Sequence, residues 1–407
     1  MSTTAPTGTV PTDNRPAVET TRTHRFFPQL EGMRAVAALG VLTTHVAFQT
    51  RAVEIPVLGQ VLGRLDLAVA LFFALSGFLL WRPWVACAHG VASRPRIRRY
   101  LAHRFVRIWP AYVVVVVLVL TLLPDAKTAS LTVWVANLTL TQVFVPLSLT
   151  AGLTQMWSLS VEVSFYLLLP LFGLALLRMR GARSHRRILV LAALAALTLT
   201  WGVIAEALPV SDGVEPKNWV IGHLPWFLAG LILAELSGII ELSGVLDGDG
   251  DLGDRPRWVR TLVALGARRW LMFAVLVVAY GLACTPLAGP TGLGDISAWQ
   301  FATKMALGAV CGLALLAPLV CSAGPFRFLA SPTMQALGRW SYGIFIWHLV
   351  VLSVVFGLFG IPAFSGHTLV VWTLTVVLTV GISAVSYALI EEPARQWLLD
   401  RERPARR

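Results

Sequence analysis

Two residues that could do chemistry, Arg34 and His45, lie eleven positions apart in the apolar stretch EGMRAVAALGVLTTH, residues 31–45. On an α-helix, eleven steps of ~100° bring the second side chain to within about 20° of the first, so both share one face. The same steps separate them by roughly 16 Å along the axis. The pattern predicts a permanent cation at one end of a helix face and a titratable imidazole deeper along it. Such a face suits a ligand with an anionic head and a reactive end that reaches inward.

Two carboxylates are expected near the depth of His45. Asp66 opens the apolar run RLDLAVALFF, and Glu162 lies within MWSLSVEVSFYLLLP. A carboxylate beside the imidazole would orient the ring and raise its basicity. Tyr166 lies one turn after Glu162 on the same helix face. Asp66 has a second interpretation, as a helix-end residue stabilised by the positive end of the helix dipole.

A basic segment, RRYLAHRFVRIWPAY, begins at Arg98 and contains Arg104 and Arg107. A spacing of three places the last two on one helix face. Paired planar guanidinium groups match the geometry of a phosphate. The alternative is that these arginines set the membrane topology and lie beside anionic lipid head groups.

The remaining polar candidates are interpreted mainly as structural. His348, near the middle of GRWSYGIFIWHLVVL, is either a hydrogen-bonded histidine of the bundle or a catalytic one, and His223 lies at a helix end. The cysteines form no CxxC pair and no zinc-ligand spacing, so neither a disulfide framework nor a metal site is expected. These cysteines are Cys87, Cys284, Cys311 and Cys321.

The elements that must position these residues are membrane-spanning helices. Of 407 residues, 56% are hydrophobic and only 13% are charged, whereas soluble domains carry about a quarter charged residues. Ten apolar runs approach the roughly 20 residues that a spanning helix needs. They are residues 31–49, 65–86, 108–124, 156–176, 188–208, 221–240, 270–287, 300–322, 340–359 and 367–390. The sequence therefore predicts an all-α, polytopic helical bundle with about ten transmembrane helices.

The distribution of basic residues predicts the orientation of the bundle. If the N-terminus is cytosolic, the outer segments hold only five of the 33 lysines and arginines. These five are Arg51, Arg64, Lys127, Lys217 and Lys304. Positive charge favours the cytosolic side, so both termini are expected there, in a multi-pass protein of the plasma membrane. The net charge of +12 is thereby explained without a nucleic-acid partner, and none is expected.

Three regions follow from this organisation. Residues 1–25, rich in Thr and Pro at their start, are expected to be a disordered cytosolic tail. Residues 26–393 form the membrane domain, and residues 394–407 form a basic cytosolic tail. The outer segment 125–155 is long for a loop and contains LTVWVANLTLTQVFVPL. It is interpreted as a re-entrant or interfacial segment, with an eleventh span as the alternative.

Several of these stretches together resemble acyltransferase family three, the integral-membrane acyltransferases that modify surface glycans, glycolipids and some antibiotics. The resemblance rests on QLEGMRAVAALGVLTTH, LDLAVALFFALSGFLL, RRYLAHRFVRIWPAY, MWSLSVEVSFYLLLPLF, LGRWSYGIFIWHLVVL and SYALIEEPARQW, in that order. It implies a bacterial enzyme with a ten-helix core that takes an acyl group, by default acetyl, from cytosolic acyl-CoA. No permanently bound cofactor is implied. The acceptor would be a hydroxyl of a cell-envelope glycan or glycolipid, or of a macrolide-type metabolite.

The resemblance also implies roles for individual residues. By position, His45 matches the essential histidine of the family, and Arg34 matches its partner in the spacing. Arg104 and Arg107 match the pair held to meet the CoA phosphates, and Glu162 matches the acidic residue of the Trp-Ser-Leu-Ser-Val-Glu element. The family often has a second acidic residue next, where this chain has a valine.

The implied mechanism leaves the role of His45 open between two alternatives. It would deprotonate the acceptor hydroxyl, which we favour, or carry the acyl group transiently. Asp66 or Glu162 would orient its ring. A lipid acyltransferase of the His-x4-Asp type is excluded, because the fifth residue after His45 is Thr50. A proton-coupled transporter or exporter remains the alternative of a different class, with His45, Asp66 and Glu162 as a proton relay.

Overall fold

The helices of this chain are seen in a computed structural model that describes residues 26–180, 183–246, 250–253, 255–292 and 294–402. Within these ranges the regular secondary structure is helical, without strands. The helices are α1 (Pro28–Gln49), α2 (Leu58–Arg64), α3 (Ala68–Ala88), α4 (Ile97–Leu122), α5 (Leu131–Leu138), α6 (Trp157–Leu176), α7 (Arg186–Thr198), α8 (Trp201–Ala207), α9 (Val220–Ser243), α10 (Arg257–Ala267), α11 (Arg269–Ala283), α12 (Ala298–Cys321), α13 (Pro332–Leu358), α14 (Thr368–Ser386) and α15 (Glu392–Glu402). The tail expected over residues 1–25, and residues 403–407 of the C-terminal one, lie outside the described ranges.

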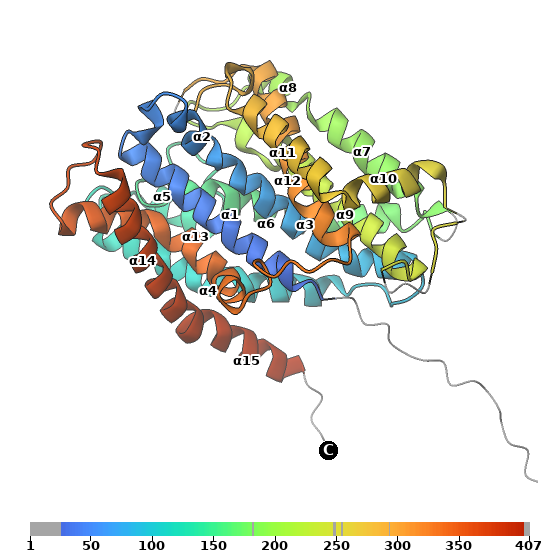
Figure 1. Ribbon diagram of the computed structural model, residues 1–407. Coiled ribbons are helices and arrows are strands. Elements are labelled where there is room, and N and C mark those ends of the chain that lie inside the picture. Colours follow the sequence, from blue (N-terminus) through green and yellow to red (C-terminus); the bar gives the residue numbers. More distant parts are fainter. Residues whose placement is uncertain (1–25, 181–182, 247–249, 254, 293, 403–407) are drawn as a thin grey trace, which may run out of the picture.

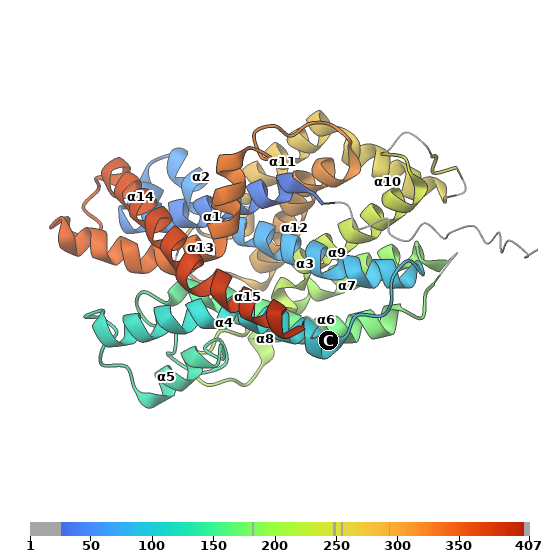
Figure 2. The ribbon, with the colours of Figure 1, turned by 90° about the horizontal axis from the view of Figure 1, so that it is seen from below.

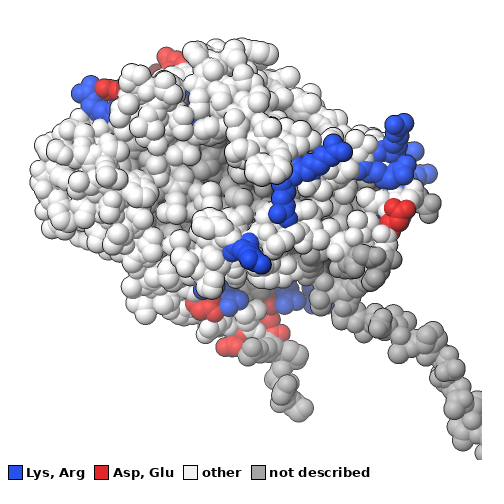
Figure 3. Space-filling model, in the orientation of Figure 1, with Lys and Arg blue, Asp and Glu red and all other residues white. Residues whose placement is uncertain are grey.

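The described helices form a polytopic membrane bundle, as the sequence predicts. Eight helical spans are long and apolar enough to cross a membrane, when α2 is joined with α3, α7 with α8, and α14 with α15. The pair α10 and α11, bent by 81°, gives a ninth if it counts as one span. The tenth expected run is α1, whose 22 residues include Arg34 and His45, two polar residues that lower its hydropathy. Figure 3 shows a mostly uncharged surface, with Lys and Arg gathered along its lower and right sides.

Close helix approach holds the centre of the bundle. A Cβ on Gly230 of α9 would collide with the backbone of Ala74 in α3, so only glycine allows these two helices to pack backbone against backbone. Phe227 of α9 stacks between Phe73 of α3 and Phe165 of α6, with ring centroids 4.2 and 4.0 Å away. In the two views, α3 runs through the middle of the bundle, with α1 on one side and α6 on another (Figures 1 and 2).

The segment 125–155 folds back and is not counted among the membrane-crossing helices. Its short helix α5 lies against α4: the Trp109 indole donates to the Leu138 carbonyl (3.3 Å) and the Tyr112 hydroxyl to the Asn137 carbonyl (2.7 Å). Tyr112 is ten residues before the end of α4, roughly 15 Å below it at 1.5 Å per residue. The Asn137 amide then donates to Ser148 on the returning arm (2.9 Å). The segment therefore folds back against α4, and its eight-residue helix α5 is too short to cross a membrane.

The described part of the basic C-terminal tail, residues 394–402, is helical. A π-helical turn, Tyr387–Glu391, follows α14 and leads into α15, which projects along the bottom of the bundle in Figure 1. Glu402 at the end of α15 pairs with Arg99 (2.8 Å) and His103 (3.1 Å) of α4. These contacts dock the basic C-terminal region as a helix.

Candidate functional site

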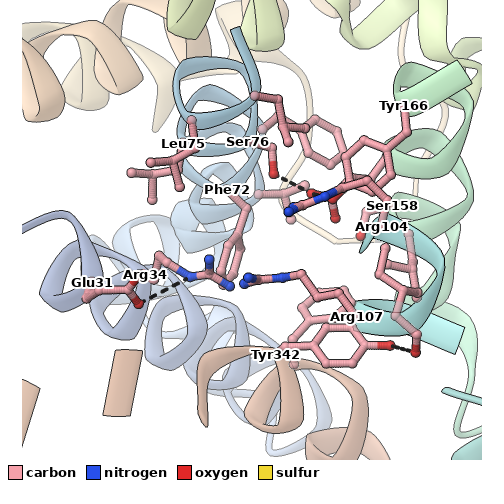
Figure 4. A pocket seen from close by; sticks show the side chains of 18 residues that line it. Glu31, Arg34, Phe72, Leu75, Ser76, Arg104, Arg107, Ser158, Tyr166 and Tyr342 are labelled. Carbon is pink, nitrogen blue, oxygen red and sulfur yellow. Dashed lines mark hydrogen bonds and ion pairs between the residues drawn. The ribbon is translucent and has the colours of Figure 1, made fainter. Parts of the chain in front are cut away.

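A cavity of about 180 Å³ lies between α1, α3, α4, α6 and α13 (Figure 4). Val69 and Leu80, the first and last residues of α3 that line it, are eleven residues apart, so it extends roughly 16 Å along that helix. Apolar side chains such as Phe72 and Phe345 line part of its wall. Its polar lining residues are Glu31, Arg34, Ser76, Arg104, Arg107, Ser158, Glu162, Tyr166 and Tyr342.

Three arginines from two helices converge in this cavity, as the sequence predicts for a phosphate site. Figure 4 shows the guanidinium groups of Arg34 and Arg107 pointing toward each other. Arg34 donates to the Ser341 hydroxyl (3.2 Å) and lies 4.0 Å from Glu31. Within the described part of the chain, Arg107 makes no side-chain hydrogen bond or ion pair. Two facing cations repel each other in a medium of low dielectric constant, so an anion between them would be strongly favoured.

The third arginine, Arg104, lies over an aromatic ring. Its guanidinium carbon is 5.9 Å from the centroid of Tyr166, within the range of a cation–π interaction. Its Nε is buried without a hydrogen-bond partner among the described residues. The three arginines and two glutamates of the lining leave one net positive charge, which suits an anionic ligand.

Glu162 belongs to the wall of the cavity. It accepts hydrogen bonds from the Ser76 hydroxyl of α3 and, at 2.7 Å, from the Tyr166 hydroxyl one turn along α6. No hydrogen bond joins it to His45. The structure thus places Glu162 in the cavity lining, with the arginines and with the Ser76 and Tyr166 hydroxyl groups.

Asp66 is paired with a lysine. Its carboxylate lies 2.6 Å from Lys304 of α12 and 4.0 Å from Arg64. Within the described part of the chain, no hydrogen bond joins it to His45. Among the described residues, no hydrogen bond links His45, Asp66 and Glu162 to one another.

His45 lies behind the aromatic part of the cavity and does not line it. Its ring centroid is 5.1 Å from that of His348 on α13. His348 in turn lies 5.9 Å from Phe345, whose ring is 6.0 Å from Phe72. The two phenylalanines line the cavity, so they separate the arginines from the two histidines. The third histidine, His223, is buried among aromatic rings.

Sequence reasoning missed several residues that shape this site. Ser76 holds Glu162, Ser341 holds Arg34, and the Tyr342 hydroxyl donates to the Ile108 carbonyl (2.7 Å). These residues could have been found in the sequence because each places a hydroxyl group inside an otherwise apolar run. Within the described ranges, no three His, Cys, Asp or Glu side chains come close enough to hold a metal ion.

Comparison with known proteins adds independent findings. A family model described as "Acyltransferase domain" matches residues 27–389. YrhL of Bacillus subtilis, proposed to be a peptidoglycan O-acetyltransferase, is 26% identical in an alignment of 399 positions that covers 92% of this chain and 56% of YrhL. The acyltransferase MdmB of Streptomyces mycarofaciens is 25% identical in an alignment of 415 positions that covers 93% of each chain. A proposed O-acetyltransferase of Staphylococcus aureus is 22% identical in an alignment of 395 positions that covers 91% of this chain and 58% of that protein.

The chain therefore spans little more than half the length of two of these relatives. No solved structure matches it significantly.

Proposed function

The chain belongs to the acyltransferase family whose domain model it matches, and we propose that it transfers an acetyl group from acetyl-CoA to a hydroxyl group in the bacterial cell envelope. Membership of the family and the bundle of apolar helices make it a multi-pass membrane acyltransferase. The donor, the acceptor, the plasma membrane as its location and the roles of individual residues are the proposal.

The observation that carries the proposal is the convergence of Arg34, Arg104 and Arg107 in a cavity that extends roughly 16 Å along α3. Coenzyme A has phosphate groups at one end and a thioester at the end of a long arm. Guanidinium groups bind phosphates with charge-assisted, often bidentate hydrogen bonds. With the phosphates held by the arginines, the arm would extend past Ser76 toward Phe72 and Phe345, and the thioester would lie near the two histidines.

The chemistry then requires one base. His45 removes the proton from the acceptor hydroxyl as its oxygen attacks the thioester carbonyl carbon. The tetrahedral intermediate collapses with cleavage of the C–S bond, and the proton on His45 passes to the CoA thiolate. The products are the ester and free CoA, and the histidine returns to its neutral form. The rings of Phe72 and Phe345 must move aside for the thioester to reach His45.

Glu162 has a supporting role in this scheme. It fixes the Ser76 and Tyr166 hydroxyl groups in the wall of the cavity. Its negative charge also offsets part of the repulsion among the arginines. Asp66 pairs with Lys304 in the turn that precedes α3, and it thereby ties the start of α3 to α12.

The acceptor is proposed to be a hydroxyl of a cell-envelope glycan or glycolipid. The support comes from two relatives that are named as proposed O-acetyltransferases, one of them for peptidoglycan. Membrane lipids surround the bundle and offer a second hydroxylated class within reach of the site.

The test uses membranes that contain the full chain and acetyl-CoA labelled in the acetyl group. Label is followed into glycan, lipid and small-molecule fractions for the wild type, His45→Ala and the control His185→Ala, which changes a histidine at the start of α7, outside the cavity. We expect transfer by the wild type and the control, and none above background with His45→Ala. Label in a lipophilic small molecule would point to a macrolide-type metabolite as acceptor. Equal transfer by His45→Ala would overturn the role of His45, and no transfer in any fraction would overturn acetyl-CoA as donor.

A further inference from the structure

His348 is a buried histidine with one ring nitrogen engaged and one free. Only 1% of the residue is exposed. Its Nδ1 lies 2.7 Å from the Phe345 carbonyl oxygen and 3.2 Å from that of Ile344. Its Nε2 is buried without a hydrogen-bond partner among the described residues.

This arrangement fixes the tautomer of the neutral ring. Carbonyl oxygens only accept hydrogen bonds, so the proton of His348 resides on Nδ1. Nε2 then carries the lone pair and can accept a hydrogen bond, but no described residue donates one to it. Buried polar groups are nearly always hydrogen-bonded, and an exception calls for a functional explanation.

The nearest polar ring is that of His45. The ring centroids are 5.1 Å apart, with an angle of 40° between the planes. No hydrogen bond joins the two rings as they lie in the structure. At this centroid spacing, a turn of the rings that points one nitrogen of each toward the other brings those nitrogens to about 3 Å, the distance of a hydrogen bond. His45 makes no side-chain hydrogen bond within the described ranges. Glu162 is engaged by Ser76 and Tyr166. Asp66 Oδ2 is engaged by Lys304, and Asp66 Oδ1 is buried without a hydrogen-bond partner and makes none with His45.

We propose that His348 is the positioning residue of His45, whose N–H donates to the free Nε2 of His348. The proposal rests on the proposed function, in which His45 is the general base. The hydrogen bond would fix one tautomer of His45, with the opposite ring nitrogen free of a proton and available to the acceptor hydroxyl. A histidine would thus occupy the place that sequence reasoning assigned to a carboxylate.

The pair of His45 and His348 also accounts for the proton that leaves the acceptor hydroxyl. When His45 accepts a proton from the acceptor hydroxyl, its existing N–H remains bonded to His348, and both His45 nitrogens then carry protons. His348 stays neutral and its Nε2 accepts a stronger, charge-assisted hydrogen bond. When the CoA thiolate takes the proton from His45, the pair returns to its starting state, with no net gain or loss of protons.

Three substitutions of His348 separate this role from a purely structural one. His348→Gln keeps an acceptor near the position of Nε2, His348→Asn keeps a polar group only near Nδ1, and His348→Leu removes both while filling the apolar site. The kcat and KM for acetyl-CoA are measured in membranes with labelled acetyl-CoA, together with the thermal stability of each purified variant.

We expect kcat to fall about 10- to 100-fold in His348→Leu and His348→Asn, as for loss of one buried positioning hydrogen bond. His348→Gln should recover most of this loss. KM should change little because His348 does not line the donor cavity. Variants that keep a hydrogen-bond acceptor near the position of Nε2 should have the higher kcat values, whatever their thermal stabilities.

Two results would overturn the inference. One is a stable His348→Leu protein with the kcat of the wild type, and the other is a His348→Gln protein as impaired as His348→Leu. Failure of the proposed function itself is distinguishable, because the wild type would then transfer no acetyl group or His45→Ala would retain full activity.

Discussion

Replacing Arg107 by alanine tests the donor site most directly. Arg34 already has Ser341 and Glu31 as partners, whereas Arg107 has no such partner in the described part of the chain. Its guanidinium is therefore the group in the cavity that has most to gain from a phosphate. A hydrogen bond to a charged group contributes about 1.5–3 kcal/mol, which corresponds to a change in affinity of roughly 10- to 150-fold.

Arg107→Ala should therefore raise the KM for acetyl-CoA by roughly 10- to 150-fold. We expect kcat to change little, because the interaction is equally strong before and during the reaction. The fold should not be weakened, since the substitution removes a cation that faces Arg34 (Figure 4). The control is Arg260→Ala on α10, an exposed arginine outside the cavity, which should leave KM unchanged.

The assay measures initial rates of acetyl transfer over a range of acetyl-CoA concentrations, for wild type and both variants. Repeating it with acetyl-dephospho-CoA shows whether Arg107 binds the phosphate on the ribose. If it does, wild type and Arg107→Ala will have similar KM values for that donor, and if it binds the pyrophosphate, the difference will persist. An unchanged KM for acetyl-CoA in Arg107→Ala, or a loss confined to kcat, would refute the assignment of the arginines to donor phosphates.

Three further substitutions have defined outcomes. Phe345→Ala removes part of the aromatic wall between the cavity and the histidines, and it should raise the rate with butyryl-CoA relative to acetyl-CoA; an unchanged ratio would exclude this wall as a limit on acyl length. Asp66→Asn removes the charge that pairs with Lys304 and with the fully buried Arg64. Because Asp66 itself is 32% exposed, the free energy of unfolding from thermal denaturation should fall by less than the about 3–5 kcal/mol of a fully buried pair. Adding Lys304→Met should restore part of it, and no recovery would argue against the pairing. Arg187→Ala breaks an ion pair with Glu235 (2.5 Å) in which both side chains are 1% exposed. It should lower the free energy of unfolding by the full about 3–5 kcal/mol, and the protein that remains folded should keep its KM for acetyl-CoA. A raised KM would connect this pair to the donor site.

Apolar run length predicts much of the fold, because only helices satisfy their own backbone hydrogen bonds in lipid. The spacing within one helix likewise predicts that Arg104 and Arg107 share a face, and both do line the cavity. The fold-back of residues 125–155 depends on Asn137 and Ser148 finding each other across a turn, and periodicity carries no signal for such a contact.

The sequence does not predict which residues of different helices become neighbours, for a related reason. Periodicity tells which face of a helix is polar but does not tell which other helix that face meets. Depth alone places Asp66 near His45 or at a helix end, and it carries no information on Lys304, 238 positions away, which pairs with Asp66 in the structure. His348 was assigned no partner for the same reason, and its position beside His45 emerges only from the packing of α1 against α13.

The contact between α1 and α13 has a mechanical consequence. A Cβ on Gly338 of α13 would collide with the backbone of Glu31 in α1, so the two helices touch at their beginnings. Farther along, Arg34 bonds Ser341 and His45 adjoins His348. If one helix slides along the other, both contacts shift together and by the same distance. In the proposed mechanism, the position of Arg34 at the donor phosphates and the position of His45 as the base would therefore change together.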